Sequence, residues 1–180
     1  MSRLFYERGY QAVGIDTIVA ESGIAKMTLY RHFPSKDDLI VAYLERANAQ
    51  FWGWLEAALA GIDDPQTRII AMMAEIGRLA ASPQCLGCAF QGAAAEFPQL
   101  EHRAHQAAQA HKQAMRAWLR DLAAAAGLRD PDGLANQLLL LIDGVWSSVR
   151  MFGAANLAGA AVPAAQSLLA AQQPGGAPPA

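Results

Sequence analysis

The stretch Leu4–Leu39, LFYERGYQAVGIDTIVAESGIAKMTLYRHFPSKDDL, decides the fold of this chain. Its apolar residues recur with a helical period and are interrupted by glycine stops. Gly9 and Gly23 fit the left-handed position that ends a helix. The pattern predicts three short helices, of which the first ends before Gly9, the second covers residues 15–22 and the third covers residues 26–33.

The rest of the chain has the same helical character. Alanine, leucine and glutamine are abundant, and no run of alternating β-branched residues indicates a strand. Cap and stop signals at Ser35, Asp64-Pro65, Gly127 and Asp130-Pro131 divide this part into further helices. We therefore expect an all-α fold of about nine helices, with the last six near residues 35–60, 65–82, 88–97, 99–126, 131–152 and 163–173.

The composition limits the class of protein. Of 180 residues, 53% are hydrophobic and 17% charged, which excludes a disordered chain and indicates apolar surface for a partner subunit or a pocket. No apolar run is long enough to cross a membrane, and the N-terminus lacks the order of a signal peptide, so we expect a soluble cytoplasmic protein. The net charge of −2 does not indicate a nucleic-acid binder, but residues 26–36 hold three basic side chains and no acid.

The second and third predicted helices form a candidate helix-turn-helix. Two short helices joined by a tight, glycine-containing turn are typical of that motif, and its second helix must bury one face and offer the other to the major groove. Leu29 and Phe33 supply the buried face, while Lys36 stands where a helix start favours a phosphate. The candidate DNA-contacting residues are Lys26, Met27, Thr28, Tyr30, Arg31, His32 and Lys36. The alternative is an ordinary pair of amphipathic helices, which shows the same period.

Leu4–Leu39 closely resembles the DNA-binding domain of the TetR family of transcriptional regulators. The matching residues, at fixed spacing, are Leu4-Phe5, Gly9-Tyr10, Ile18, Gly23-Ile24, Thr28-Leu29-Tyr30, His32-Phe33, Ser35-Lys36 and Leu39. The resemblance implies a helix-turn-helix DNA-binding domain over residues 1–46 and a larger helical domain for ligand binding and dimerisation over residues 47–173. The proline, glycine and alanine of residues 174–180 predict a disordered tail.

The resemblance also implies a role for each residue of the third helix. Lys26 and Met27 would face base edges, and Arg31 would contact a base or a phosphate. The phosphate backbone would be held by Thr28, Tyr30, His32 and Lys36.

The chain departs from the family pattern at three places. Gly14 and Ala25 stand where a serine or threonine usually caps a helix. The first helix is also short, so we expect either a true start upstream of Met1 or DNA binding with a trimmed first helix.

The predicted second domain offers a dimer interface and a pocket. The helix over residues 131–152 is apolar around much of its girth, which favours burial against a partner subunit as well as its own domain. The candidate interface residues are Val145, Val149 and Phe152; a core helix of a monomer is the alternative. Candidate pocket residues are the large, adaptable side chains of Met73, Phe90, Phe97, Met115, Trp118 and Trp146, each of which also suits ordinary core.

Two further features leave alternatives open. Cys85 and Cys88 form a C-x-x-C pair, which suits a redox switch, half of a zinc site completed by His102 and His105, or simply packed cysteines. Glu96 lies in an apolar segment, where it would pair with a ligand or with Arg150, or face water.

The sequence thus predicts a DNA-binding transcriptional regulator and not an enzyme, with no cofactor and no metal. We expect a repressor, homodimeric on a palindromic double-stranded operator and released by a small, largely apolar effector, with no membrane partner. One alternative is a thiol redox enzyme or sensor using Cys85 and Cys88. Another is a dimeric small-molecule binder that has lost DNA binding through its short first helix.

Overall fold

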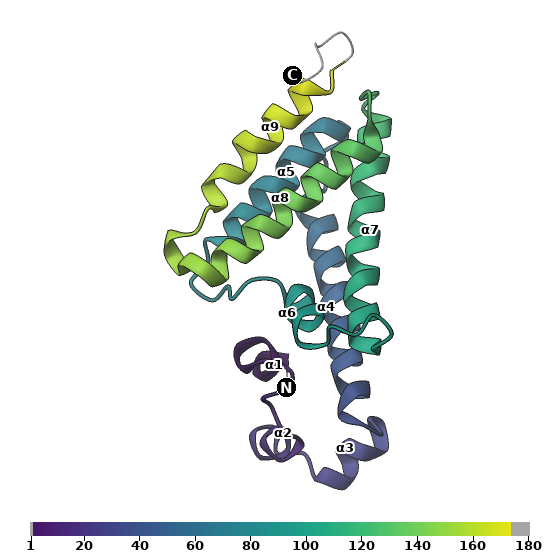
Figure 1. Ribbon diagram of the computed structural model, residues 1–180, viewed down its shortest axis with the longest axis vertical. Helices are drawn as coiled ribbons and strands as arrows, with labels where there is room; N and C mark the ends of the chain where they lie inside the picture. The colour runs from purple at the N-terminus through teal and green to yellow at the C-terminus, as the bar shows by residue number, and fades with distance from the viewer. Residues whose placement is uncertain (1, 174–180) are drawn as a thin grey trace. The chain divides into compact units, whose positions relative to one another are not determined.

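The structure, a computed structural model, describes residues 2–173 of the chain (Figure 1). The expected all-α fold is confirmed over these residues, which hold nine α-helices, two short 3-10 helices and no strand. The α-helices are α1 (Ser2–Arg8), α2 (Ile15–Ser22), α3 (Lys26–His32), α4 (Lys36–Ala58), α5 (Pro65–Ala80), α6 (Ala89–Glu96), α7 (Arg103–Ala125), α8 (Pro131–Phe152) and α9 (Ala161–Ala171). The 3-10 helices η1 (Gly153–Ala155) and η2 (Ala158–Ala160) join α8 to α9.

Side-chain caps start three of the longer helices where the sequence predicted. At α4, the N–H of Asp38 donates to Ser35 Oγ (3.1 Å), and the N–H of Ser35 donates back to Asp38 Oδ2 (3.0 Å). This reciprocal pair satisfies two backbone donors that a helix start leaves without a partner. Asp64 before α5 and Asp130 before α8 each accept from the N–H three residues later, at 2.7 and 2.9 Å.

Two helices begin at other residues than the sequence predicted. Residues before α7 form a turn, in which the N–H of His102 donates to the carbonyl of Gln99 (3.0 Å), and His102 Nδ1 then accepts from the N–H of Ala104 (3.2 Å). The imidazole therefore caps α7, which begins at the next residue. Helix α9 begins two residues before Pro163. This position tolerates a proline, because N–H groups in the first turn have no partner within the helix.

The described chain divides into two compact units. Unit 1 combines the chain up to Phe51 with Ala89–His111, and unit 2 combines Trp52–Cys88 with the chain from Lys112 onward. Helices α4 and α7 contribute residues to both units. Neither unit is a continuous stretch of sequence, because α6 and the start of α7 pack with the N-terminal helices. The functional division at residue 46 stays a prediction, and the expected tail lies outside the described residues.

The core of unit 1 is built around aromatic rings. The ring of Tyr10 stacks on Phe5 with centroids 5.6 Å apart, so the chain folds back on itself past the end of α1. Tyr43 of α4 lies 5.7 Å from Phe5 and 5.9 Å from Tyr10, and Phe97 lies 6.2 Å from Tyr10. These contacts hold α1 against α4 and the end of α6.

The core of unit 2 lies among α5, α8 and α9, which pack side by side (Figure 1). Their inward faces bury mostly aliphatic side chains, among them Ile69, Met72, Ile76, Leu138 and Ile142. Within residues 2–173, none of the helices combines the length and hydropathy of a membrane-spanning segment.

Candidate nucleic-acid interface

Helices α2 and α3 have the geometry of a helix-turn-helix. Three residues separate them, and α2 packs directly on α3. Gly23 ends α2 with a φ of +68°, and its N–H donates to the carbonyl of Val19 (3.0 Å). Only a glycine adopts this left-handed conformation readily, so Gly23 permits the tight turn. Ile18 of α2 and Leu29 of α3 are buried and anchor the pair to unit 1.

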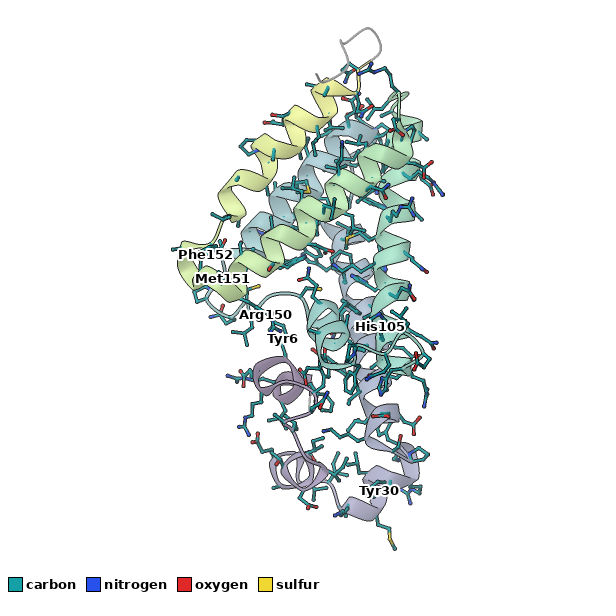
Figure 2. All side chains as sticks on the ribbon, viewed as in Figure 1. Tyr6, Tyr30, His105, Arg150, Met151 and Phe152 are labelled. Carbon is teal, nitrogen blue, oxygen red and sulfur yellow. The ribbon has the colours of Figure 1, made fainter. Side chains whose placement is uncertain are left out.

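The two faces of α3 separate as expected at Leu29, whereas Phe33, which the sequence analysis placed on the buried face, is half-buried. Leu29 exposes 3% of its surface, whereas Met27 exposes 86% and Tyr30 exposes 41%. Figure 2 shows Tyr30 on this helix. Lys26, Arg31 and His32 are also exposed, while Thr28 is half-buried. The helix therefore presents donors, a thioether and a phenol to solvent on a buried leucine anchor.

Lys26 has an acidic neighbour that the sequence did not indicate. Its ammonium lies 2.7 Å from Asp16 Oδ1, and this hydrogen bond and the aspartate charge raise the pKa of Lys26. Both side chains are exposed, so water and salt screen the pair. Lys26 thus stays protonated, in an exposed ion pair with Asp16.

Lys36, at the first turn of α4, is held by the turn between α1 and α2. Its Nζ donates to the carbonyl oxygen of Gln11 (3.0 Å). A lysine ammonium has three donors, so two remain for a phosphate. The phosphate contact at Lys36 stays a prediction.

Ion pairs join the first turn of α4 to the residues at the start of α7. The carboxylate of Asp38 accepts from the Ser35 hydroxyl (2.6 Å) and pairs with Arg103, and these hydrogen bonds lower the pKa of Asp38. His102 Nε2 lies 3.5 Å from Asp37 Oδ2. Sequence reasoning missed these contacts, because no local pattern relates residues 65 positions apart.

Glu96 has a role that none of the sequence alternatives described. At the end of α6, its carboxylate accepts from the backbone N–H groups of Tyr10 (3.0 Å) and Gln11 (2.7 Å). It therefore binds the turn between α1 and α2. Gly14 and Ala25 at the starts of α2 and α3 make no side-chain cap, as the sequence predicted.

The six candidate pocket residues are packed side chains divided between the units. In unit 1, Phe90 stacks on His111 with centroids 3.7 Å apart, and Phe97 stacks on His102 at 4.3 Å. The unit 2 members are the buried Met73, Met115 and Trp146 and the half-buried Trp118. Their assignment to a ligand pocket stays a prediction.

Of the three candidate interface residues on α8, only one is exposed. Val145 and Val149 are buried inside unit 2, because α5 and α9 pack on that side of α8. Phe152 is exposed, together with Met151 at the same end of the helix (Figure 2). Leu140 exposes 73% of its surface in the middle of α8. The assignment of α8 residues to a dimer interface stays a prediction.

The cysteine pair lies between α5 and α6. Cys85 is half-buried and Cys88 is buried, and neither is in a disulfide. Among the described residues, no three His, Cys, Asp or Glu side chains gather as metal ligands, and the role of the cysteine pair stays open.

Comparison with known proteins agrees with this geometry. The profile described as bacterial regulatory proteins, tetR family, matches residues 2–43. A TetR-family transcriptional regulator from Streptomyces coelicolor is 33% identical, with 95% of this chain and 90% of that chain covered and a TM-score of 0.90. A tetR-type transcriptional regulator from Streptomyces avermitilis is 32% identical, covers 95% and 93%, and has a TM-score of 0.83.

A curated relative matches over a shorter stretch. The HTH-type transcriptional activator FasR from Mycolicibacterium smegmatis is 37% identical over 70 residues, which are 39% of this chain and 32% of FasR. The chain thus spans about a third of the length of the curated relatives it matches.

The fold and the exposed face of α3 define a helix-turn-helix transcriptional regulator. The near full-length similarity to the Streptomyces coelicolor protein fixes the family: the chain belongs to the TetR family. The relatives are regulators and not enzymes, which does not favour the thiol redox alternative.

Proposed function

We propose that this chain is a cytoplasmic repressor that binds a palindromic operator as a homodimer and is released by a small, largely apolar ligand. The observation that carries the proposal is the division of α3 into a buried Leu29 and an exposed face. That face has the size and chemistry to enter a major groove, where an α-helix reads base edges.

The contacts divide into base readout and phosphate binding. Lys26 and Met27 at the start of α3 would meet base edges, and Arg31 would contact a base or a phosphate. Phosphate contacts at Thr28, Tyr30, His32 and Lys36 would fix the register of the helix on the duplex.

Selection from a random duplex library, followed by binding measurements over a range of salt, tests this assignment. Lys36→Ala is expected to weaken binding to all sequences alike and to reduce the slope of log K against log salt by about 0.9, the value for one lost phosphate contact. Met27→Ala should instead alter base preference and keep the slope. If Lys36→Ala changes base preference and leaves the slope intact, the phosphate role is wrong.

The exposed face of α8 supports the dimer. Leu140, Gly144, Ser147 and Met151 are exposed and follow one another at helical spacing, so they form one stripe. The two large apolar side chains of this stripe, Leu140 and Met151, would lose contact with water if a partner covered them, while Gly144 and Ser147 would permit close approach. A two-fold dimer would also place two α3 helices on successive major grooves, about 34–36 Å apart.

Light scattering with Leu140→Glu tests the dimer. We expect monomers that have lost operator affinity, whereas Gln113→Glu, an added charge at an exposed site of α7, should remain dimeric. The proposal fails if the wild-type chain is a monomer that binds a single half-site.

An effector would act by changing the separation of the two α3 helices. It can shift that equilibrium only by its difference in affinity for the two states. Screening small apolar molecules for thermal stabilisation and for release of operator DNA tests the effector role. A reporter assay then distinguishes repression, which we propose, from activation, which the name of FasR states for that protein.

A further inference from the structure

Both ends of α6 are hydrogen-bonded to the turn between α1 and α2. At the start of α6, the carbonyl of Ala89 accepts from the Tyr10 hydroxyl (2.9 Å). At its end, the Glu96 carboxylate accepts from the N–H of Tyr10 through Oε1 and from the N–H of Gln11 through Oε2. The Gln11 side-chain amide donates to the Glu96 carbonyl. All of these residues belong to unit 1.

The approach of the carboxylate depends on the backbone of the turn. Gly9 has a φ of +87°, and a Cβ at this position would stand 2.9 Å from Glu96 Oε1. A side chain at residue 9 would therefore be strained by the backbone conformation and would displace the Glu96 carboxylate from its place beside the turn. The two adjacent backbone N–H groups match a carboxylate, because its two oxygens can each accept one hydrogen bond.

The backbone of Gln11 is hydrogen-bonded to two different side chains. The N–H of Gln11 donates to Glu96, while its carbonyl accepts from Lys36 Nζ (3.0 Å). One residue of backbone thus joins the end of α6 to the lysine at the start of α4. Fixing Gln11 therefore also fixes where the Lys36 ammonium lies.

We propose that Glu96 is a positioning residue for DNA binding: it orients the backbone of Gln11, which holds Lys36 for its phosphate contact. The inference rests on the proposed function, because it needs Lys36 to bind DNA. Glu96 itself contacts no DNA in this scheme. An ammonium held in place loses less entropy when it binds a phosphate, so its contact contributes more to affinity.

The sign of the effect separates positioning from simple electrostatics. Glu96→Gln removes a negative charge, which alone would favour DNA. It also leaves one acceptor oxygen for two N–H donors and turns an amide donor toward them. We expect roughly tenfold weaker operator binding, the order expected when the charged hydrogen bond between Lys36 and a phosphate is lost. Glu101→Gln, the same change at an exposed site of unit 1, should bind as tightly as wild type or more tightly.

Double-variant binding measurements test the route through Lys36. In a Lys36→Ala background, Glu96→Gln should cause no further loss, because the residue that it positions is absent. Glu96→Asp retains the charge but shortens the side chain, and it should also weaken binding in the wild-type background only. Hydrogen exchange provides a readout without DNA: the amides of Tyr10 and Gln11 should exchange faster in both Glu96 variants.

Each outcome decides a different point. Tighter binding by Glu96→Gln, or an equal loss in the Lys36→Ala background, overturns the positioning role and leaves the proposed function standing. Unchanged exchange at Tyr10 and Gln11 also overturns it. A folded wild-type chain that selects no duplex overturns the proposed function, and the inference with it.

Discussion

The two neighbouring residues Leu29 and Tyr30 provide a sharp test of how α3 is built. Leu29 is 3% exposed, so Leu29→Ala removes three buried carbon atoms. At about 0.8 kcal/mol for each buried methylene, the transfer cost is about 2.4 kcal/mol. The cavity left behind adds to this, and the total for a buried leucine is about 2–5 kcal/mol. Tyr30 is 41% exposed, so its loss leaves no closed cavity and should cost about 1 kcal/mol or less.

Thermal denaturation and operator binding of the two variants measure this difference. For a chain of this size, 1 kcal/mol corresponds to a change in Tm of about 2–4 °C. Leu29→Ala should therefore lower Tm by about 4–20 °C, and Tyr30→Ala by about 4 °C or less. At a temperature where both variants are folded by circular dichroism, Tyr30→Ala should lose operator binding while its oligomeric state stays that of wild type.

An equal loss of Tm in the two variants would show that the buried and exposed faces of α3 are misassigned. Tyr30→Ala with full operator affinity would refute the role of the phenol in DNA binding. Because the two residues are adjacent, a general disturbance of α3 cannot produce the expected contrast.

Three further changes have expected outcomes. Ala25→Ser supplies the cap that α3 lacks and should raise the unfolding free energy by about 1 kcal/mol, measured by urea denaturation; no gain would mean that the hydroxyl does not reach the helix N–H groups. Hydrogen bonds from side-chain hydroxyls lower the pKa values of Asp38 and Asp64 in the folded state. The two ionised carboxylates therefore contribute their full stabilisation above the pKa of an unfolded aspartate, about 3.9. This contribution is lost as the pH falls through their folded-state pKa values. Acid titration of Tm should therefore show a smaller fall for Asp38→Asn than for wild type, and equal curves would contradict this. Gly87→Ala should lower Tm more than Gly127→Ala does. Both glycines have a positive φ, but only at Gly87 would a Cβ meet a backbone oxygen of α8, at 2.9 Å. Equal losses of Tm would mean that backbone strain accounts for the whole effect.

Local signals explain why so much of the fold could be predicted. Gly9 and Gly23 end helices because their backbone conformation is nearly closed to other residues, and Ser35, Asp64 and Asp130 start helices by capping the N–H groups that follow them. Each effect involves residues within about one helical turn of each other, so the sequence alone contains it. The same holds for α3, where the spacing around Leu29 separates a buried from an exposed face.

What the sequence could not determine are the contacts between residues far apart in the chain. Glu96 lies 85 positions from Gln11, and its partners depend on how α6 packs in unit 1. Val145 and Phe152 look alike as apolar residues of one helix, but α5 and α9 cover the first and leave the second exposed. Hydrophobicity determines that a side chain favours burial, whereas the packing of neighbouring helices determines which apolar side chains obtain it.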